Sequence, residues 1–306
     1  MEIINSLENL IIKEETVAAL GNFDGIHAGH KVILQDALDT AIESGLKSLC
    51  FTFSNHPYNF IMHKGENDPG ALKLICSEQD KIKMIEEMGF DYLVNVPFDE
   101  KMMEMTSSEF FDSILLASLN ASVISVGFNF TYGVNAEGNA ESLYKDGEDS
   151  GVEVRVHDPV KIFHNVVSST LIREAITEAN IESASMYLDR EYSFANTVSH
   201  GKKIGTLLGI PTINFPAPTD ILLPPNGVYA SRTIIDGTEY KSITNIGTKP
   251  TVGGIDKTIE THIFDYNDDA YGKTAKVVLE KYIRPEKKFD SIDELKEQIK
   301  IDIQEG

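Results

Sequence analysis

The sequence predicts an α/β domain followed by a small all-β domain that ends in one helix. Between residues 16 and about 160, short apolar segments alternate with helical patterns, which is typical of a parallel sheet covered by helices. After about residue 185, strand-like segments are separated by turns rich in Gly, Pro, Asn and Asp, and this pattern predicts an antiparallel β-barrel. The 306 residues suffice for two domains of ordinary size, and we place them at 1–186 and 187–306.

The individual elements follow from the period of the apolar residues. The apolar run 16–20 predicts a buried first strand, and Ile33, Leu34, Leu38 and Ala41 recur at the spacing of a helix. By the same criteria, the first domain has strands at 16–20, 48–53, 92–96, 122–126 and 152–156 and helices at 31–44, 77–88 and 107–119. The second domain has strands at 194–199, 228–235, 240–246, 258–264 and 275–283 and a terminal helix at 291–303.

The most informative segment links the first strand to the first helix. It reads Gly21-Asn22-Phe23-Asp24-Gly25-Ile26-His27-Ala28-Gly29-His30. Glycines allow close approach of the backbone to a ligand, and the N-terminus of a helix attracts phosphate. Because His27 and His30 are three residues apart, both can face the same side of the first helical turn. The segment therefore predicts a nucleotide-phosphate site.

Two other interpretations of this segment remain. Two histidines can be half of a metal site, although no Cys or third His lies near them in sequence, and a glycine-rich turn can be only a tight turn. Its position after a first strand favours phosphate binding over both. Neither G-x-G-x-x-G nor G-x-x-x-x-G-K-[ST] occurs in the chain, which argues against an ordinary dinucleotide dehydrogenase or P-loop kinase.

Charge is distributed unevenly along the chain. The net charge of the chain is −21, of which residues 1–190 contribute −18 and residues 191–306 contribute −3. Such acidity argues against nucleic acid or an anionic membrane as a partner, and most of the acids are expected on a solvated surface. A triphosphate bound by this first domain must therefore rely on backbone N–H groups, histidines, a divalent metal and one or two arginines.

The composition indicates a cytoplasmic protein. The chain has only two cysteines, Cys50 and Cys76, too few for a disulfide framework. Its first ten residues are acidic where a signal peptide would be basic, and no apolar run is long enough to span a membrane.

Further dense motifs follow in both domains. The run Ser168-Ser169-Thr170-Leu171-Ile172-Arg173 opens a predicted helix and is either a plain helix cap or a second phosphate cradle. The segments 51–57, which ends in His56-Pro57, and 126–133, which contains Asn129, each follow a predicted strand. In the second domain, residues 201–214 combine three glycines with the extended run Pro211-Thr212-Ile213-Asn214, in which Thr212 and Asn214 can face one ligand.

Together these motifs resemble the bacterial bifunctional riboflavin kinase/FAD synthase family. The first segment is similar to its nucleotidylyltransferase motif H-x-G-H, and residues 168–173 to its S-S-T-x-I-R motif. Residues 201–214 resemble its kinase signature G-x-x-x-G-x-x-L-G-x-P-T-x-N. The resemblance extends from about residue 16 to 303. It implies a Rossmann-like nucleotidylyltransferase domain followed by a riboflavin kinase barrel.

For the first domain, the resemblance implies transfer of the adenylyl group of ATP to FMN. His27, His30 and Arg173 are the expected catalytic residues, and His56 and Asn129 are expected to bind FMN. The residues expected to bind ATP are Gly21, Phe23, Asp24, Gly25, Gly29, Ser169 and Thr170. Mg²⁺ is the expected metal, with ATP as co-substrate and flavin as substrate and product, not as a prosthetic group.

For the second domain, the resemblance implies phosphorylation of riboflavin. Glu260 is the expected general base, and Arg284 is expected at the flavin or the phosphate. Gly201, Gly205, Thr212 and Asn214 are expected to bind ATP, the last two also through Mg²⁺, for which a hydroxyl and an amide oxygen are suitable ligands. The chain departs from the family pattern at Asp189, Asn196 and Thr206, of which the last removes a cation near the kinase phosphates.

Two alternatives accompany this interpretation. The adenylyltransferase alone could be active, with the barrel as a flavin-binding module, or the chain could be a non-catalytic flavin-binding regulator. The intact motifs in both domains argue against the regulator. We expect a monomer or a weak homo-oligomer with small-molecule partners only.

Overall fold

The computed structural model describes residues 1–63, 70–199, 211–251, 254–266 and 268–287, together with 294, 297, 298, 301 and 302. By its internal contacts the chain divides into two compact units, Met1–Ser168 and Ser169–Gly306, and each is described by itself. None of the helices within the described residues is long and apolar enough to cross a membrane.

The first unit is built on a six-stranded parallel sheet, as the alternating pattern predicted. The strands have the order β1-β4-β3-β2-β5-β8, so the chain runs outward from β2 on both sides. In such sheets ligands bind beyond the carboxyl ends of the strands, where the order reverses. The strands are β1 (Glu2–Ile4), β2 (Thr16–Leu20), β3 (Lys47–Phe53), β4 (Tyr92–Val96), β5 (Ala121–Gly127) and β8 (Glu153–His157).

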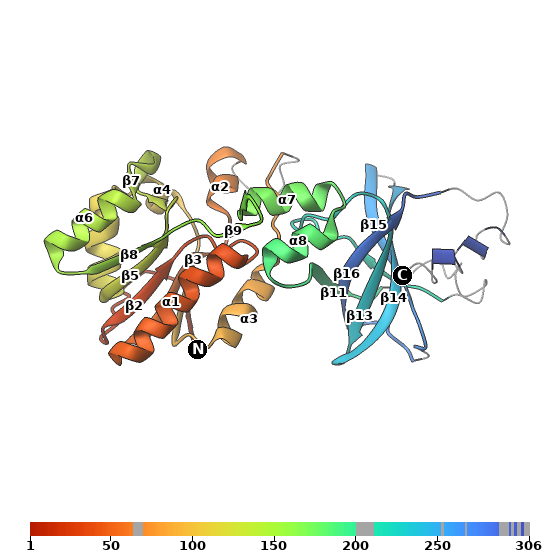
Figure 1. Ribbon diagram of the computed structural model, residues 1–306, viewed down its shortest axis with the longest axis horizontal. Helices are drawn as coiled ribbons and strands as arrows, with labels where there is room; N and C mark the ends of the chain where they lie inside the picture. Colours follow the sequence, from red (N-terminus) through yellow and green to blue (C-terminus); the bar gives the residue numbers. More distant parts are fainter. Residues whose placement is uncertain are drawn as a thin grey trace. The chain divides into compact units, whose positions relative to one another are not determined.

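Helices and two short hairpins complete this unit (Figure 1). The helices are α1 (Ala28–Ser44), α2 (Pro57–His63), α3 (Glu78–Met88), α4 (Glu100–Glu104), α5 (Ser107–Glu109), the π-helix η1 (Phe110–Ser118), the 3₁₀ turn η2 (Val134–Ala136) and α6 (Ala140–Ser150). The hairpins pair β6 (Thr131–Tyr132) with β7 (Gly138–Asn139), and β9 (Lys161–Ile162) with β10 (Asn165–Val166). The expected helix 107–119 is thus mostly π-helical, as the hydrogen bond from Leu119 N to Ile114 O at 2.9 Å shows.

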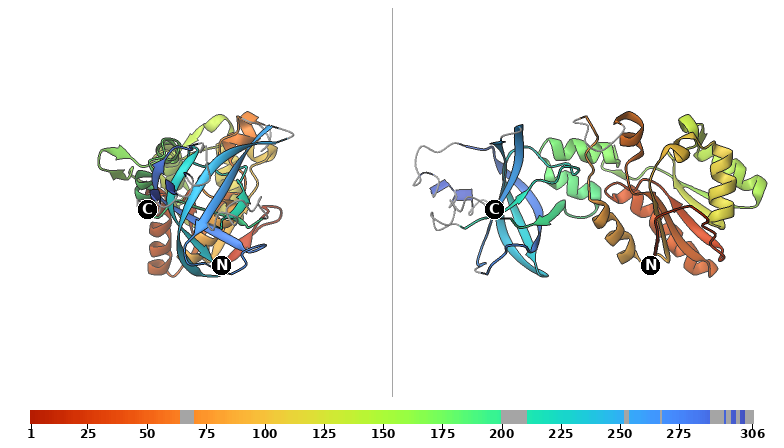
Figure 2. Two further views of the ribbon diagram at one scale, coloured as in Figure 1. Left: turned by 90° about the vertical axis from the view of Figure 1, so that its right-hand side faces the viewer. Right: turned by 180° about the vertical axis from the view of Figure 1, so that it is seen from behind.

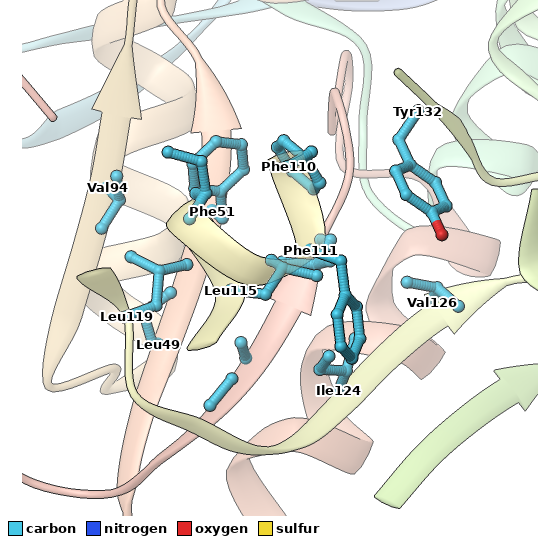
Figure 3. Close-up of a cluster of buried hydrophobic side chains, with 14 of the residues drawn as sticks. Leu49, Phe51, Val94, Phe110, Phe111, Leu115, Leu119, Ile124, Val126 and Tyr132 are labelled. Carbon is cyan, nitrogen blue, oxygen red and sulfur yellow. The ribbon is translucent and has the colours of Figure 1, made fainter. Parts of the chain in front are cut away.

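Strand β2 explains why both faces of the sheet are covered. All five of its residues are buried, and successive side chains point to opposite faces. Val17 and Ala19 pack with α1 and α3, whereas Ala18 and Leu20 pack with η1. Figure 3 shows the second cluster, in which Phe110 of η1 lies beside Phe51 of β3 and Phe111 lies beside Ile124 of β5. This three-layer packing fixes the position of α1, and hence of the segment that precedes it.

The second unit is a nearly closed six-stranded antiparallel barrel (Figure 2). Its strand order is β11-β16-β13-β14-β15-β12, and the edge strands meet through a bridge between Ser199 and Asn214. Asn196, one of the departures from the family pattern, donates its Nδ2 to Pro216 O at 2.7 Å across the same edge. The elements are α7 (Ser169–Thr177), α8 (Ile181–Leu188), β11 (Ser193–Thr197), β12 (Ile213–Pro216), β13 (Gly227–Ile235), β14 (Thr238–Thr251), β15 (Gly254–Ile263) and β16 (Thr274–Arg284).

Helix α8 lies before the barrel and contacts β16. It ends at Asp189, whose φ of 51° is left-handed and therefore suits a glycine at this position. Of the expected terminal helix, five positions are described, and all are helical: Glu294, Glu297, Gln298, Ile301 and Asp302. The expected boundary at 186/187 stays a prediction.

Candidate active sites

The segment between β2 and α1 is a tightly held turn at the carboxyl end of the sheet. Gly21 N donates to Phe51 O at 3.2 Å, and Asp24 Oδ1 accepts a hydrogen bond from Ile75 N at 2.9 Å. Gly25 has a φ of 81°, and a Cβ there would lie 2.8 Å from Ile75 Cγ2, so only glycine fits. Phe23 is fully buried, and its side chain packs in the core cluster beneath the turn, together with apolar residues of α1 and α3.

The two histidines lie together at the start of α1. Their rings stack with centroids 3.6 Å apart, and His27 Nδ1 caps the helix by accepting a hydrogen bond from His30 N at 3.2 Å. A neutral His27 therefore carries its proton on Nε2. Gly29 permits this arrangement, since a Cβ there would lie 3.2 Å from His27 Cε1. The pair thus lies where the backbone N–H groups and the dipole of α1 favour an anion.

His30 is electrostatically unusual. Its Nδ1 is buried and has no hydrogen-bond partner among the described residues, and Phe23 meets its ring edge-on at 5.3 Å. Burial lowers the pKa of His30 well below its ordinary value, and the charges of His27 and Lys81 lower the pKa further. His30 is therefore neutral at neutral pH.

This depressed pKa makes stability depend on pH. The unfolded chain takes up a proton on His30 at its ordinary pKa near 6.5, but the folded chain does so only at lower pH. The contribution of His30 to stability is therefore complete above pH 6.5 and is lost as the pH falls toward the folded pKa. We expect the melting temperature to fall less between pH 7.5 and 5.5 in His30→Gln than in the wild type. Equal falls in the two proteins would contradict this account.

Two other expected residues lie at the same edge of the sheet. His56 follows β3, and its Nδ1 accepts a hydrogen bond from Tyr58 N at 3.2 Å at the start of α2. Asn129 follows β5 and is exposed. Because the strands are parallel, His56, Asn129 and the His27–His30 segment all follow carboxyl ends at one edge. Ser169, Thr170 and Arg173 lie together on α7 in the other unit, so the structure relates them only to one another.

In the barrel, Glu260 lies at the centre of a row of polar residues. On β15 it pairs directly with Asn214 of β12 on one side and with Asn245 of β14 on the other. Cross-strand partners point to the same face of a sheet. Asn214 Nδ2 lies 3.5 Å from Thr212 Oγ1, so the structure brings Thr212, Asn214 and Glu260 together. Gly201 and Gly205 lie outside the described residues.

Two polar residues at these sites were not predicted from the sequence. Asn245 belongs to a run that matches the family, but only the pairing of β14 with β15 reveals that it neighbours Glu260. Lys81 of α3 is buried and borders a pocket at the carboxyl ends of β2 and β3. It lies four residues before the buried Ile85, on the apolar face of α3, and this spacing is the signal that could have found it.

Arg284 has a strong partner inside the second unit. Its Nε and Nη2 donate to the two carboxylate oxygens of Asp302 at 2.8 and 2.7 Å, and Gln298 Nε2 donates to Asp302 Oδ1 at 3.0 Å. The Asp302 side chain is 2% exposed. The arginine thus anchors the C-terminal segment to β16, and its expected contact with flavin or phosphate stays a prediction.

This ion pair predicts a large effect on stability. Asp302→Ala leaves a mostly buried guanidinium without its carboxylate, which costs about 3–5 kcal/mol in such pairs. Asp236→Ala is the matched control, because Asp236 pairs with Lys273 in an exposed position and should contribute at most about 1 kcal/mol. Urea unfolding of the two variants measures the difference. Equal losses would contradict the anchoring role of Arg284 and Asp302.

Comparison with known proteins identifies a family for each half of the chain. The FAD synthetase family matches residues 10–171, and the riboflavin kinase family matches residues 188–306. A bifunctional riboflavin kinase/FMN adenylyltransferase of Bacillus subtilis is 35% identical over 97% of this chain and 94% of its own length. The protein of the same description from Escherichia coli K12 is 32% identical over 98% and 95%.

A solved structure from Streptococcus pneumoniae, described as a macrolide-efflux protein, has a TM-score of 0.89 and 30% identity, covering 99% of this chain and 97% of its own. The fold is thus shared along the whole length. With both family matches and these full-length relatives, the chain belongs to the bifunctional riboflavin kinase/FMN adenylyltransferase family.

Proposed function

We propose how the residues of this enzyme divide between its two reactions. The enzyme phosphorylates riboflavin to FMN with ATP and then adenylylates FMN to FAD. Matches to both families along the chain favour this activity over an adenylyltransferase with a merely flavin-binding barrel.

In the adenylyltransferase reaction, the phosphate of FMN attacks the α-phosphorus of ATP, and the bond to the leaving pyrophosphate breaks. That phosphate is already anionic, so the enzyme needs alignment and charge stabilisation more than a strong base. His27 and His30 bind the ATP phosphates, and His56 and Asn129 bind FMN. The observation that supports the assignment to ATP is that His27 and His30 stack at the N-terminus of α1. The remaining contacts to ATP come from the backbone of Gly21, Phe23, Asp24, Gly25 and Gly29 and from Ser169, Thr170 and Arg173.

In the kinase reaction, Glu260 accepts the proton of the ribityl 5′-hydroxyl as that oxygen attacks the γ-phosphorus of ATP. The observation that supports this role of Glu260 is its direct cross-strand pairing with Asn214. The hydroxyl of Thr212 and the amide oxygen of Asn214 are hard donors that fit Mg²⁺, and the metal supplies charge neutralisation on the ATP phosphates. Gly201 and Gly205 are further ATP-binding residues in this proposal. Arg284 acts at the flavin or phosphate end through its place on β16.

One assay tests the whole proposal. The purified chain is incubated with riboflavin, ATP and Mg²⁺, and FMN and FAD are resolved by chromatography. FAD formed from riboflavin is the expected result. FAD formed only from supplied FMN would refute the kinase assignment, and neither product would refute both. Omitting Mg²⁺ should abolish both products.

We further propose that the enzyme works in the cytoplasm, as a monomer or a weak homo-oligomer, without nucleic-acid or membrane partners. Both cysteines, Cys50 and Cys76, are buried, and two cysteines are too few for a disulfide framework, which suits a reducing compartment.

A further inference from the structure

Lys81 is a buried cation at the edge of the sheet where the adenylyltransferase residues gather. It lies in the first turns of α3 and is 7% exposed. Its Nζ donates to Phe53 O at 2.6 Å and lies 3.4 Å from Thr52 Oγ1, which itself donates to Asn22 O at 3.0 Å. The ammonium group therefore lies between the turn that leads to His27 and the segment that leads to His56.

The positive charge of Lys81 is not needed for these hydrogen bonds. Both acceptors are neutral oxygens, which an uncharged amide could satisfy without the cost of burying a charge. Among the described residues, no carboxylate forms an ion pair with Nζ. The acids whose charges act on Lys81, Asp24 and Glu78, accept hydrogen bonds from other donors, Ile75 N and Asn95 Nδ2. The buried charge thus suits an anion that arrives with a substrate.

The surroundings of Lys81 have the features of a phosphate site. Lys81 lines a pocket together with Asn22, Asp24, Ser54, His56 and Ser77, at the carboxyl ends of β2 and β3. Burial lowers the pKa of Lys81 by more than the charges of Asp24 and Glu78 raise it, so the acids nearby do not compensate the buried ammonium group. The first domain is acidic and has few cations, so a buried lysine in this pocket is a rare source of positive charge.

We propose that Lys81 binds a substrate phosphate in the adenylyltransferase reaction, either that of FMN or one of the ATP triphosphate. A remaining N–H and the charge meet the phosphate, while the short bond to Phe53 O fixes the direction of the ammonium group. The inference rests on the assignment of this edge of the sheet to adenylyl transfer.

The test compares three variants of the full-length enzyme in FAD synthesis from supplied FMN. Lys81→Met removes the charge at similar length, Lys81→Arg keeps it, and Thr52→Val removes the neighbouring hydroxyl without changing charge. Lys81→Met should raise one KM by about ten- to a hundredfold, while Lys81→Arg and Thr52→Val stay within about threefold of the wild type. A raised KM for FMN identifies the FMN phosphate, and a raised KM for ATP identifies the triphosphate.

Two results would overturn the proposal. One is an unchanged KM for both substrates in Lys81→Met, and the other is an equal effect of Lys81→Met and Thr52→Val, which would indicate a structural role only. If Lys81→Met does not fold, the pH profile decides. The wild type should lose affinity for the phosphate substrate as the pH rises and Lys81 loses its proton, whereas Lys81→Arg should keep it, and identical profiles would refute the role. His30→Ala, measured in parallel, shows separately whether the site itself is correctly assigned.

Discussion

FAD formation from supplied FMN should fall about 10²–10³-fold in a His30→Ala variant, because one group that stabilises charge on the reacting phosphates is removed. His30 lies at the N-terminus of α1, stacks on His27 and has a buried Nδ1 without a partner among the described residues. The loss should appear mainly in kcat, since the interaction strengthens as charge develops in the transition state. Steady-state kinetics with FMN and ATP varied separately measures it.

Two controls accompany this prediction. The same variant should phosphorylate riboflavin at the wild-type rate, because Glu260 belongs to the other unit. His164→Ala removes an exposed histidine of the first unit and should leave both activities unchanged. Near-native FAD formation by His30→Ala would refute the assignment of His27 and His30.

Local pattern was sufficient to predict the class of each domain. The five expected strands of the first domain all exist, because a buried parallel strand needs a short apolar run that the sequence displays directly. The helices α6 and α8 were not predicted. α6 contains Gly147 and many polar residues, and it is held by its Asn139 cap and by Gly151. Such a helix depends on capping and tertiary contacts more than on periodicity.

The sites show where sequence reasoning ends. Spacing alone placed His27 and His30 on one helical turn, because that relation is local. The neighbours of Glu260 depend on strand register, which joins residues 46 positions apart in the case of Asn214, and no local signal specifies it. Arg284 was assigned to the ligand, yet its partner Asp302 becomes visible only when the C-terminal segment packs on the barrel.

Lys81 illustrates a second limit. It lies four residues before Ile85 and so shares the apolar face of α3, but a lysine at such a position usually keeps its charged end in water. In the folded chain its stem crosses to the ends of β2 and β3, and the ammonium group is buried there. Burial of a charge is decided by long-range packing, which composition and spacing do not determine.

Glu260→Gln should lower riboflavin phosphorylation about 10²–10⁴-fold while leaving FAD formation from supplied FMN intact. Glutamine keeps the size of the side chain and can still donate or accept hydrogen bonds beside Asn214 and Asn245, but it cannot take the proton of the attacking hydroxyl. The effect should therefore fall on kcat more than on the KM for riboflavin. FMN and FAD formed from riboflavin, and FAD formed from FMN, are quantified by chromatography.

The matched control is Glu239→Gln, another strand carboxylate of the barrel, which pairs with Arg232 and has no neighbour from the expected kinase motif. It should retain both activities, because an exposed ion pair contributes at most about 1 kcal/mol. If Glu260→Gln kept its kinase activity, the row of Asn214, Glu260 and Asn245 would be only a feature of barrel packing. If instead both reactions were lost, the carboxylate would stabilise the fold rather than act as a base. Only a selective loss of FMN formation fits proton transfer at Glu260.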